Sequence, residues 1–272
     1  MPETSQPERA TEARAADPPS LVDLIAKGVL DAELAALVWM LVEGRVPLVV
    51  AAPEGRLAAG AQLLAGVIGS IHADEQLDTL GSPLGPAGAS SLVRGRRAGG
   101  VLEAASLEEV RARLGSGALP LTADQLTFIG CVLVLGEDAA PRAEAGDAPV
   151  TAPSTGRGRR SRLRVTVAHY VRPLARDAHG HSQRLDPAVL AAWDGRLGKY
   201  EHFAWGVMPE IASRLGRRTG DLEADIHHRR DDLAGLAKAG VTKLDEVRRL
   251  IAGYQVGYGE GHGQGHAGER PH

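Results

Sequence analysis

A turn that follows the apolar run at residues 47–52 has residue types that could contact a phosphate. It contains a glycine, Gly55, and a cation, Arg56. A glycine turn between a strand and a helix exposes backbone N–H groups that can bind phosphate oxygens. The carboxylate of Glu54 in the same turn would repel a phosphate held there. The sequence therefore predicts a vestigial phosphate loop, formed by Pro53, Glu54, Gly55, Arg56 and Gly60.

Two groups of residues in the C-terminal half could bind a ligand or a partner. His179 and His181 are weak metal-ligand candidates, because imidazole suits zinc. Their spacing is not the i, i+4 spacing of a helical pair, and the flanking Asp177 and Gly180 indicate a surface turn. The second group concentrates aromatic side chains in a chain that is only 3% aromatic. It predicts either a small core or a partner-docking patch, formed by Tyr200, His202, Phe203 and Trp205.

Hydrophobic patterning predicts an α/β protein. Residues 47–52 and 128–135 are continuous apolar runs, typical of strands that are buried on both faces. A helical pattern with Asp31 as its expected N-cap precedes the first run, and another helical pattern follows it. Helix, buried strand, glycine turn and helix, in this order, open a P-loop-like unit. We therefore expect a P-loop-NTPase-like core sheet flanked by helices, with the first run buried at its centre.

Composition divides the chain into segments. Residues 1–19 are polar and contain several prolines, and residues 255–272 are rich in glycine and histidine, so both are expected to be disordered. Residues 20–136 are predicted to form the degenerate P-loop-like core. Residues 137–162, rich in Ala, Pro, Gly and charge, are predicted to be a flexible linker. Residues 163–254 are expected to form a strand followed by a mostly helical C-terminal unit.

Charge, cysteine content and apolar run lengths restrict the class of protein. The formal net charge of -3 argues against a nucleic-acid-binding protein, whose domain is usually strongly basic. A single cysteine, Cys131, excludes an intrachain disulfide and favours a reducing compartment. The first residues lack the apolar region of a signal peptide, and charged residues interrupt the longest apolar stretches, so no membrane span is expected. We therefore predict a cytoplasmic protein.

The stretches on either side of the glycine turn carry a resemblance to a known family. They are residues 24–37 (LIAKGVLDAELAAL), 44–52 (GRVPLVVAA) and 99–114 (GGVLEAASLEEVRARL). The first two are similar to the helix and strand that lead to the Walker A loop in the traffic ATPases of type II secretion, type IV secretion and Flp-type pilus assembly. The third resembles the histidine-box region of that family, and residues 164–167 resemble a later strand. The resemblance covers residues 20–170 and implies a P-loop α/β core.

The catalytic side chains of that family are not found in this chain. The loop has no Gly-Lys-Ser/Thr sequence, so it lacks the lysine that reaches the β- and γ-phosphates and the hydroxyl that holds Mg²⁺. Glu103 stands where the resemblance places the histidine of the histidine box. The stretch between Ile68 and Gly99 is shorter than the family's Walker B region requires. The resemblance thus implies a degenerate and shortened relative that needs no cofactor.

Three functions remain open. The first is a non-catalytic, secretion-ATPase-like protein that acts as a structural or regulatory partner of an active paralogous ATPase or another component of an assembly machine. The second is a divergent ATPase of secretion or pilus assembly, which would use ATP with Mg²⁺. The third is a module that binds a small ligand or a metal at the C-terminal histidines. Nucleotide binding separates the first two, and metal analysis tests the third.

Overall fold

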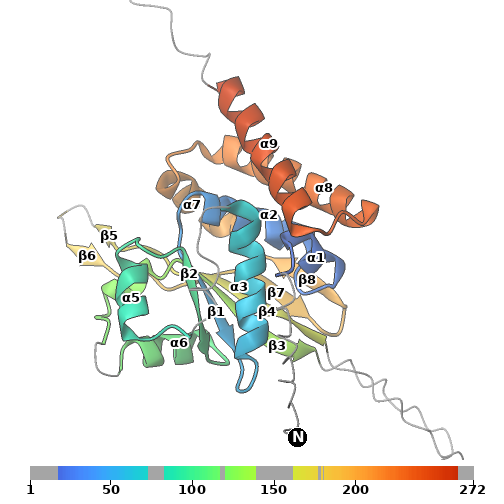
Figure 1. Cartoon of the computed structure of the whole chain (residues 1–272). Helices are drawn as coiled ribbons and strands as arrows, with labels where there is room; N and C mark the ends of the chain where they lie inside the picture. Colours follow the sequence, from blue (N-terminus) through green and yellow to red (C-terminus); the bar gives the residue numbers. More distant parts are fainter. Residues whose placement is uncertain are drawn as a thin grey trace, which may run out of the picture.

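A six-stranded mixed sheet forms the centre of the protein, which is known here from a computed structural model (Figure 1). The structure describes residues 18–72, 83–116, 120–138, 162–176, 179 and 181–262. The strand order is β2-β1-β3-β4-β7-β8. The strands are β1 (Leu48–Ala52), β2 (Gly99–Glu103), β3 (Cys131–Asp138), β4 (Arg162–Tyr170), β7 (Ala188–Asp194) and β8 (Lys199–His202). A separate two-stranded ribbon pairs β5 (Ala175–Arg176) with β6 (Ser182–Gln183). The predicted α/β class is confirmed.

Strand β1 is parallel to both of its neighbours, β2 and β3. All of its residues are buried, with Val50 packed in one hydrophobic cluster and Val49 in the other. A parallel strand covered on both faces has a continuous apolar sequence rather than an alternating one. The prediction of a buried parallel strand with neighbours on both sides is confirmed for residues 48–52, although β1 is the second strand from one edge of the sheet. The apolar run at residues 128–135 also lies in this sheet, where β3 begins at Cys131.

Helices cover the sheet in two layers of unequal size (Figure 1). The larger layer contains α1 (Leu21–Ala26), α2 (Ala32–Glu43), α3 (Leu57–Ile71), α7 (Met208–Arg214), α8 (Thr219–Ala239) and α9 (Leu244–His262). The smaller layer contains α5 (Pro86–Val93) and α6 (Leu107–Leu114), with the 3-10 turn η1 (Gln125–Phe128) beside them. A second 3-10 turn, η2 (Ala204–Val207), connects β8 to α7. Within the described ranges, no helix combines the length and apolar character that crossing a bilayer requires.

The sheet continues across the segment predicted to be a linker. Strands β3 and β4 pair antiparallel, with Asp138 opposite Arg162, so both ends of the predicted linker 137–162 belong to strands. Residues 139–161 lie outside the described residues. Strands β4, β7 and β8 then extend the sheet that β1 to β3 begin. One sheet therefore contains strands from both sides of the predicted boundary between the core and the C-terminal unit.

Two parts of the C-terminal half differ from the sequence-based expectation. Residues 188–202, expected to be helical, form the β7–β8 hairpin. Its turn is fixed locally, because the Asp194 side chain accepts backbone hydrogen bonds at 2.7 and 3.0 Å and Gly198 adopts a φ of 65°. Helix α9 runs to His262, eight residues beyond Tyr254, where disorder was expected to begin. Glycines weaken a helix by about 1 kcal/mol each but do not forbid it.

Buried charges connect three helices of the larger layer. The guanidinium of Arg229 in α8, whose side chain is 3% exposed, donates to Asp225 Oδ1 at 2.9 Å and also to Glu43 of α2. It lies 4.3 Å from the ring centroid of Trp39 and 5.1 Å from that of Tyr254 in α9. The Tyr254 hydroxyl donates to the Asp225 carboxylate at 2.7 Å. Charge, hydrogen bonds and ring contacts therefore fix α2, α8 and α9 relative to one another.

We expect Arg229→Met to lower the free energy of unfolding by about 3 kcal/mol, because it leaves the buried carboxylate of Asp225 without its main partner. Arg217 also pairs with Asp225, so the loss of stability should be at the lower end of the range expected when a buried ion pair is broken. Urea denaturation measures the change. Arg230→Met is the matched control on the same helix. Its pair with Asp231 is exposed (36% and 68%), so the cost should stay below about 1 kcal/mol. Equal losses in the two variants would contradict the prediction.

Candidate functional site

The predicted phosphate loop lies at the carboxyl ends of the parallel strands. It connects β1 to α3, and Gly55 in its middle has a φ of 72°, a left-handed conformation that favours glycine. Ligands of open α/β sheets bind at this edge. A cavity of about 550 Å³ opens here, lined by the loop, by a residue that follows β2 and by residues of β3 and β4. The lining residues outside the loop include Ala105, Gly136, Glu137 and Thr166.

A carboxylate of the chain itself accepts a hydrogen bond from a backbone N–H group of the loop. The backbone N–H of Gly55 donates to Oε1 of Glu103 at 3.0 Å. Glu103 is the last residue of β2 and lies opposite Ala52, the last residue of β1, so its side chain can reach the turn that follows β1. The sequence placed Glu103 in a histidine box but did not predict this contact. An amide that a phosphate loop would offer to its ligand is bound here by a carboxylate.

The cation of the loop, Arg56, also forms an ion pair with a carboxylate of the protein. Arg56 Nη2 lies 2.5 Å from Oε1 of Glu137, near the end of β3. Glu137 fell in the predicted linker, so sequence reasoning missed it. The Thr166 hydroxyl donates to the Val134 carbonyl oxygen at 3.2 Å. The Gly55 amide, the Arg56 guanidinium and the Thr166 hydroxyl thus each contact an acceptor of the protein itself.

Gly60 has a packing role rather than a place in the loop. It lies inside α3, which begins at Leu57. A Cβ atom at Gly60 would come within 2.7 Å of Cγ2 of Val101 and 3.0 Å of Cβ of Ala52. Only glycine therefore lets α3 approach β1 and β2 this closely. Of the predicted loop, the structure brings together Pro53, Glu54, Gly55 and Arg56, with Glu103 beside them.

The two histidines of the predicted metal site are exposed on the segment between β5 and β6. The ring centroids of His179 and His181 are 6.3 Å apart. In the part of the chain that the structure describes, no three His, Cys, Asp or Glu residues come together in a group suited to a metal ion. The geometry of His179 and His181 alone therefore gives no argument for a metal centre.

The structure separates the aromatic group into a core residue and surface residues. Tyr200 is buried and makes a T-shaped contact with Trp193, with ring centroids 5.1 Å apart. Its hydroxyl lies 2.9 Å from the carbonyl oxygen of Val29 and 2.7 Å from that of Val165. Phe203 and Trp205 are exposed, and 78% of the Trp205 surface is accessible to solvent. Of the two alternatives predicted for this group, Tyr200 therefore belongs to the core, whereas Phe203 and Trp205 lie on the surface.

Trp205 lies beside a cavity of about 300 Å³ between α2, η2 and α8. We call Phe203, Trp205 and this cavity the Trp205 surface. The cavity combines apolar side chains with carboxylates from two helices, which sequence reasoning did not connect with the aromatic patch because they are distant along the chain. The cavity is lined by Glu33, Leu37, His202, Ala204, Trp205, Met208, Glu223, Ile226 and His227.

His202 connects the edge strand β8 to the start of α2. Its Nε2 lies 2.9 Å from Oδ2 of Asp31, whose Oδ1 accepts the backbone N–H of Leu34 as the N-cap of α2. Glu33 Oε1 lies 3.8 Å from His202 Nδ1. Burial of the ring opposes protonation, but the hydrogen bond to Asp31 and the charges of Asp31 and Glu33 outweigh it. The pKa of His202 is therefore raised above its ordinary value.

Neither a protein-family model nor a curated protein matches this chain. The resemblance to the traffic ATPases therefore stays a prediction from the residues that carry it.

Protonated His202 should stabilise the fold, so its contribution should depend on pH. Because the folded-state pKa is raised, this contribution is present in full below the unfolded pKa of about 6.5 and is lost as the pH rises through the folded value. We expect the stability difference between the wild type and His202→Gln to be larger at pH 5.5 than at pH 8.5. Urea denaturation across this range measures it, and the other histidines cancel in the difference. A difference that grows with pH would contradict the assignment.

Proposed function

We propose that the chain is a non-catalytic binding protein that captures a protein partner through the Trp205 surface. The observation that carries the proposal is the exposure of Trp205 beside a cavity that can accept a partner's side chain. Tryptophan is enriched among the residues that dominate binding energy, and it commonly pairs with a pocket on the other protein. An indole left 78% exposed contributes little to the fold, so its large apolar area is available for binding.

The charges around Trp205 favour a particular partner chemistry. Glu33 and Glu223 bring carboxylates to the cavity, whereas Leu37, Met208 and Ile226 provide apolar contacts. A segment with an apolar side chain next to a lysine or arginine would complement both features. The resemblance to secretion ATPases suggests where to look for it: an active paralogous ATPase or another component of a secretion or pilus-assembly machine. Such a partner would be bound in the cytoplasm.

The state of the phosphate loop supports binding rather than catalysis. The Gly55 amide is bound to Glu103, and Arg56 is paired with Glu137. A bound nucleotide would have to displace both carboxylates and would still lack the lysine and hydroxyl that hold its phosphates and Mg²⁺. The geometry therefore does not favour the alternative of a divergent ATPase.

Trp205→Ala should weaken partner capture by about 30-fold, corresponding to ~2 kcal/mol for an interface hot spot. Its stability should stay within about 0.5 kcal/mol of the wild type, because the side chain is exposed. Leu197→Ala, in the exposed β7–β8 turn, is the matched control and should bind as the wild type does. Candidate partners are proteins that the wild type and the control retain and the variant does not, each then purified and titrated by calorimetry. Equal binding by all three proteins would exclude the Trp205 surface.

Mg-ATP should show no micromolar binding to the purified protein in calorimetry, because the loop lacks the lysine and the hydroxyl that hold the phosphates and Mg²⁺. Arg56→Ala should change neither this result nor partner capture, and its exposed ion pair should contribute under about 1 kcal/mol of stability. Magnesium-dependent binding that Arg56→Ala abolishes would instead support the divergent ATPase.

A further inference from the structure

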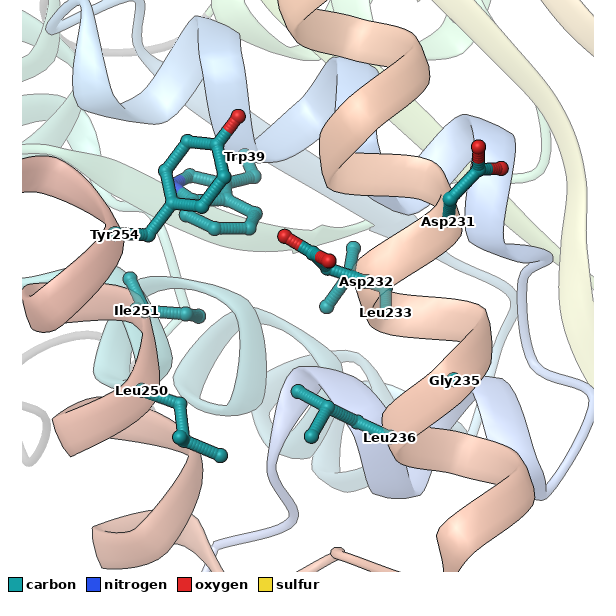
Figure 2. Close-up of a pocket in the computed structure, with 9 residues that line it drawn as sticks. All are labelled: Trp39, Asp231, Asp232, Leu233, Gly235, Leu236, Leu250, Ile251 and Tyr254. Carbon is teal, nitrogen blue, oxygen red and sulfur yellow. The ribbon is translucent and has the colours of Figure 1, made fainter. Parts of the chain in front are cut away.

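Helices α8 and α9 flank a cavity that is open to solvent on one side and separate from the Trp205 surface. A short turn joins the two helices, but α8 packs mainly on α2 and α1, whereas α9 packs mainly on α3. Between them lies a cavity of about 450 Å³, shown in Figure 2. Its size falls in the range of small-molecule sites.

The walls of this cavity are apolar. Leu233 and Leu236 on α8 face Leu250 and Ile251 on α9 across the gap (Figure 2). Leu250 is 45% exposed, although leucine is usually buried in a fold with a core of this size. An occupant with an aliphatic or aromatic body would remove these side chains from water, which stabilises a complex by about 25 cal/mol for each Å² of apolar surface buried.

One end of the cavity is held rigid before any ligand arrives. Trp39 and Tyr254 close this end, with their ring centroids 5.3 Å apart in a T-shaped arrangement (Figure 2). The Tyr254 hydroxyl is fixed by its hydrogen bond to Asp225, and the Arg229 guanidinium lies near both rings. A preformed site loses less conformational entropy on binding than one that must first be ordered.

The polar groups of the cavity select a positive charge. The Asp232 carboxylate points into the gap, whereas the Asp231 carboxylate points away from it (Figure 2). Within the described residues, the side chain of Asp232 makes no hydrogen bond or ion pair, and the cavity lining includes no Lys, Arg or His. The negative end of the α8 helix dipole lies on the same side, because the cavity is lined by the C-terminal half of that helix.

We propose that this cavity binds a small amphiphilic cation, an ammonium group carried on an aliphatic or aromatic body. The ammonium would lie at Asp232 and the body between the leucine walls, with its end against Trp39 and Tyr254. Neither residues 1–17 nor residues 263–272 contain Leu, Ile, Val, Phe, Tyr or Trp, so these segments offer no comparable apolar group. The site goes beyond the proposed partner binding and shares no lining residue with the Trp205 surface.

Methyl NMR titration of the full chain with n-octylammonium at pH 7 tests the proposal. The methyl resonances of Leu233, Leu236, Leu250 and Ile251 should shift together and saturate. Sodium n-octanoate, with a tail of similar length and the opposite charge, should bind more weakly. Asp232→Asn should weaken n-octylammonium binding about two- to fivefold, as expected for a solvent-accessible ion pair. Asp231→Asn should leave it unchanged.

Gly235→Leu should abolish the shifts by filling the cavity. A Cβ atom at Gly235 meets no atom within 4 Å, and leucine is a better helix former than glycine, so this variant should fold. Trp205→Ala should bind n-octylammonium as the wild type does, which separates this proposal from the proposed function. Absence of shifts at these methyls, or equal affinity for n-octylammonium and n-octanoate, would overturn the proposal. Shifts that follow protein concentration instead of amine concentration would assign the cavity to a second copy of the chain and overturn it too.

Discussion

Asp225 and Arg229 place opposite charges inside the helical layer, and the position of that layer depends on neutralising them. A buried charge without a partner is costly, so α2 must bring Glu43 and α9 must bring the Tyr254 hydroxyl to one point on α8. Burial favours the neutral form of Asp225, but hydrogen bonds from Arg229, Arg217 and Tyr254 outweigh it and hold the pKa of Asp225 below its ordinary value. The position of α8 in turn sets one wall of the Trp205 surface and one wall of the cavity beside α9.

Features of the fold that the sequence predicted are encoded locally. The continuous apolar runs at residues 47–52 and 128–135 indicate that β1 and β3 are buried on both faces. Asp31 accepts a backbone hydrogen bond at the start of α2, where the capping pattern places it. The β7–β8 hairpin was missed because its alanine-rich first strand also suits a helix, and pairing with β4 decides between the two. That pairing joins two strands separated along the chain by the β5–β6 ribbon, so no local pattern could reveal it.

The two candidate sites likewise combine residues that a local sequence pattern can identify with residues that only the folded chain brings together. The loop was predictable because its residues are contiguous, whereas its partners Glu103 and Glu137 depend on the register of three strands. Tyr200 and Trp205 are close in sequence, yet β8 directs the first into the core and η2 leaves the second in solvent. Aromatic content alone could identify this group but could not divide it between core and surface.

The hydrogen bond from Gly55 to Glu103 gives the turn after β1 an internal acceptor, which an anion from solution would have to displace. A side chain fixed on the adjacent strand acts at an effective concentration that, for a short connection, reaches the order of millimolar. A phosphate from solution competes against that concentration and must also overcome repulsion from Glu54. An inhibitory segment that imitates a substrate works by the same principle. In this protein one carboxylate, on the strand next to the turn, holds the corresponding position.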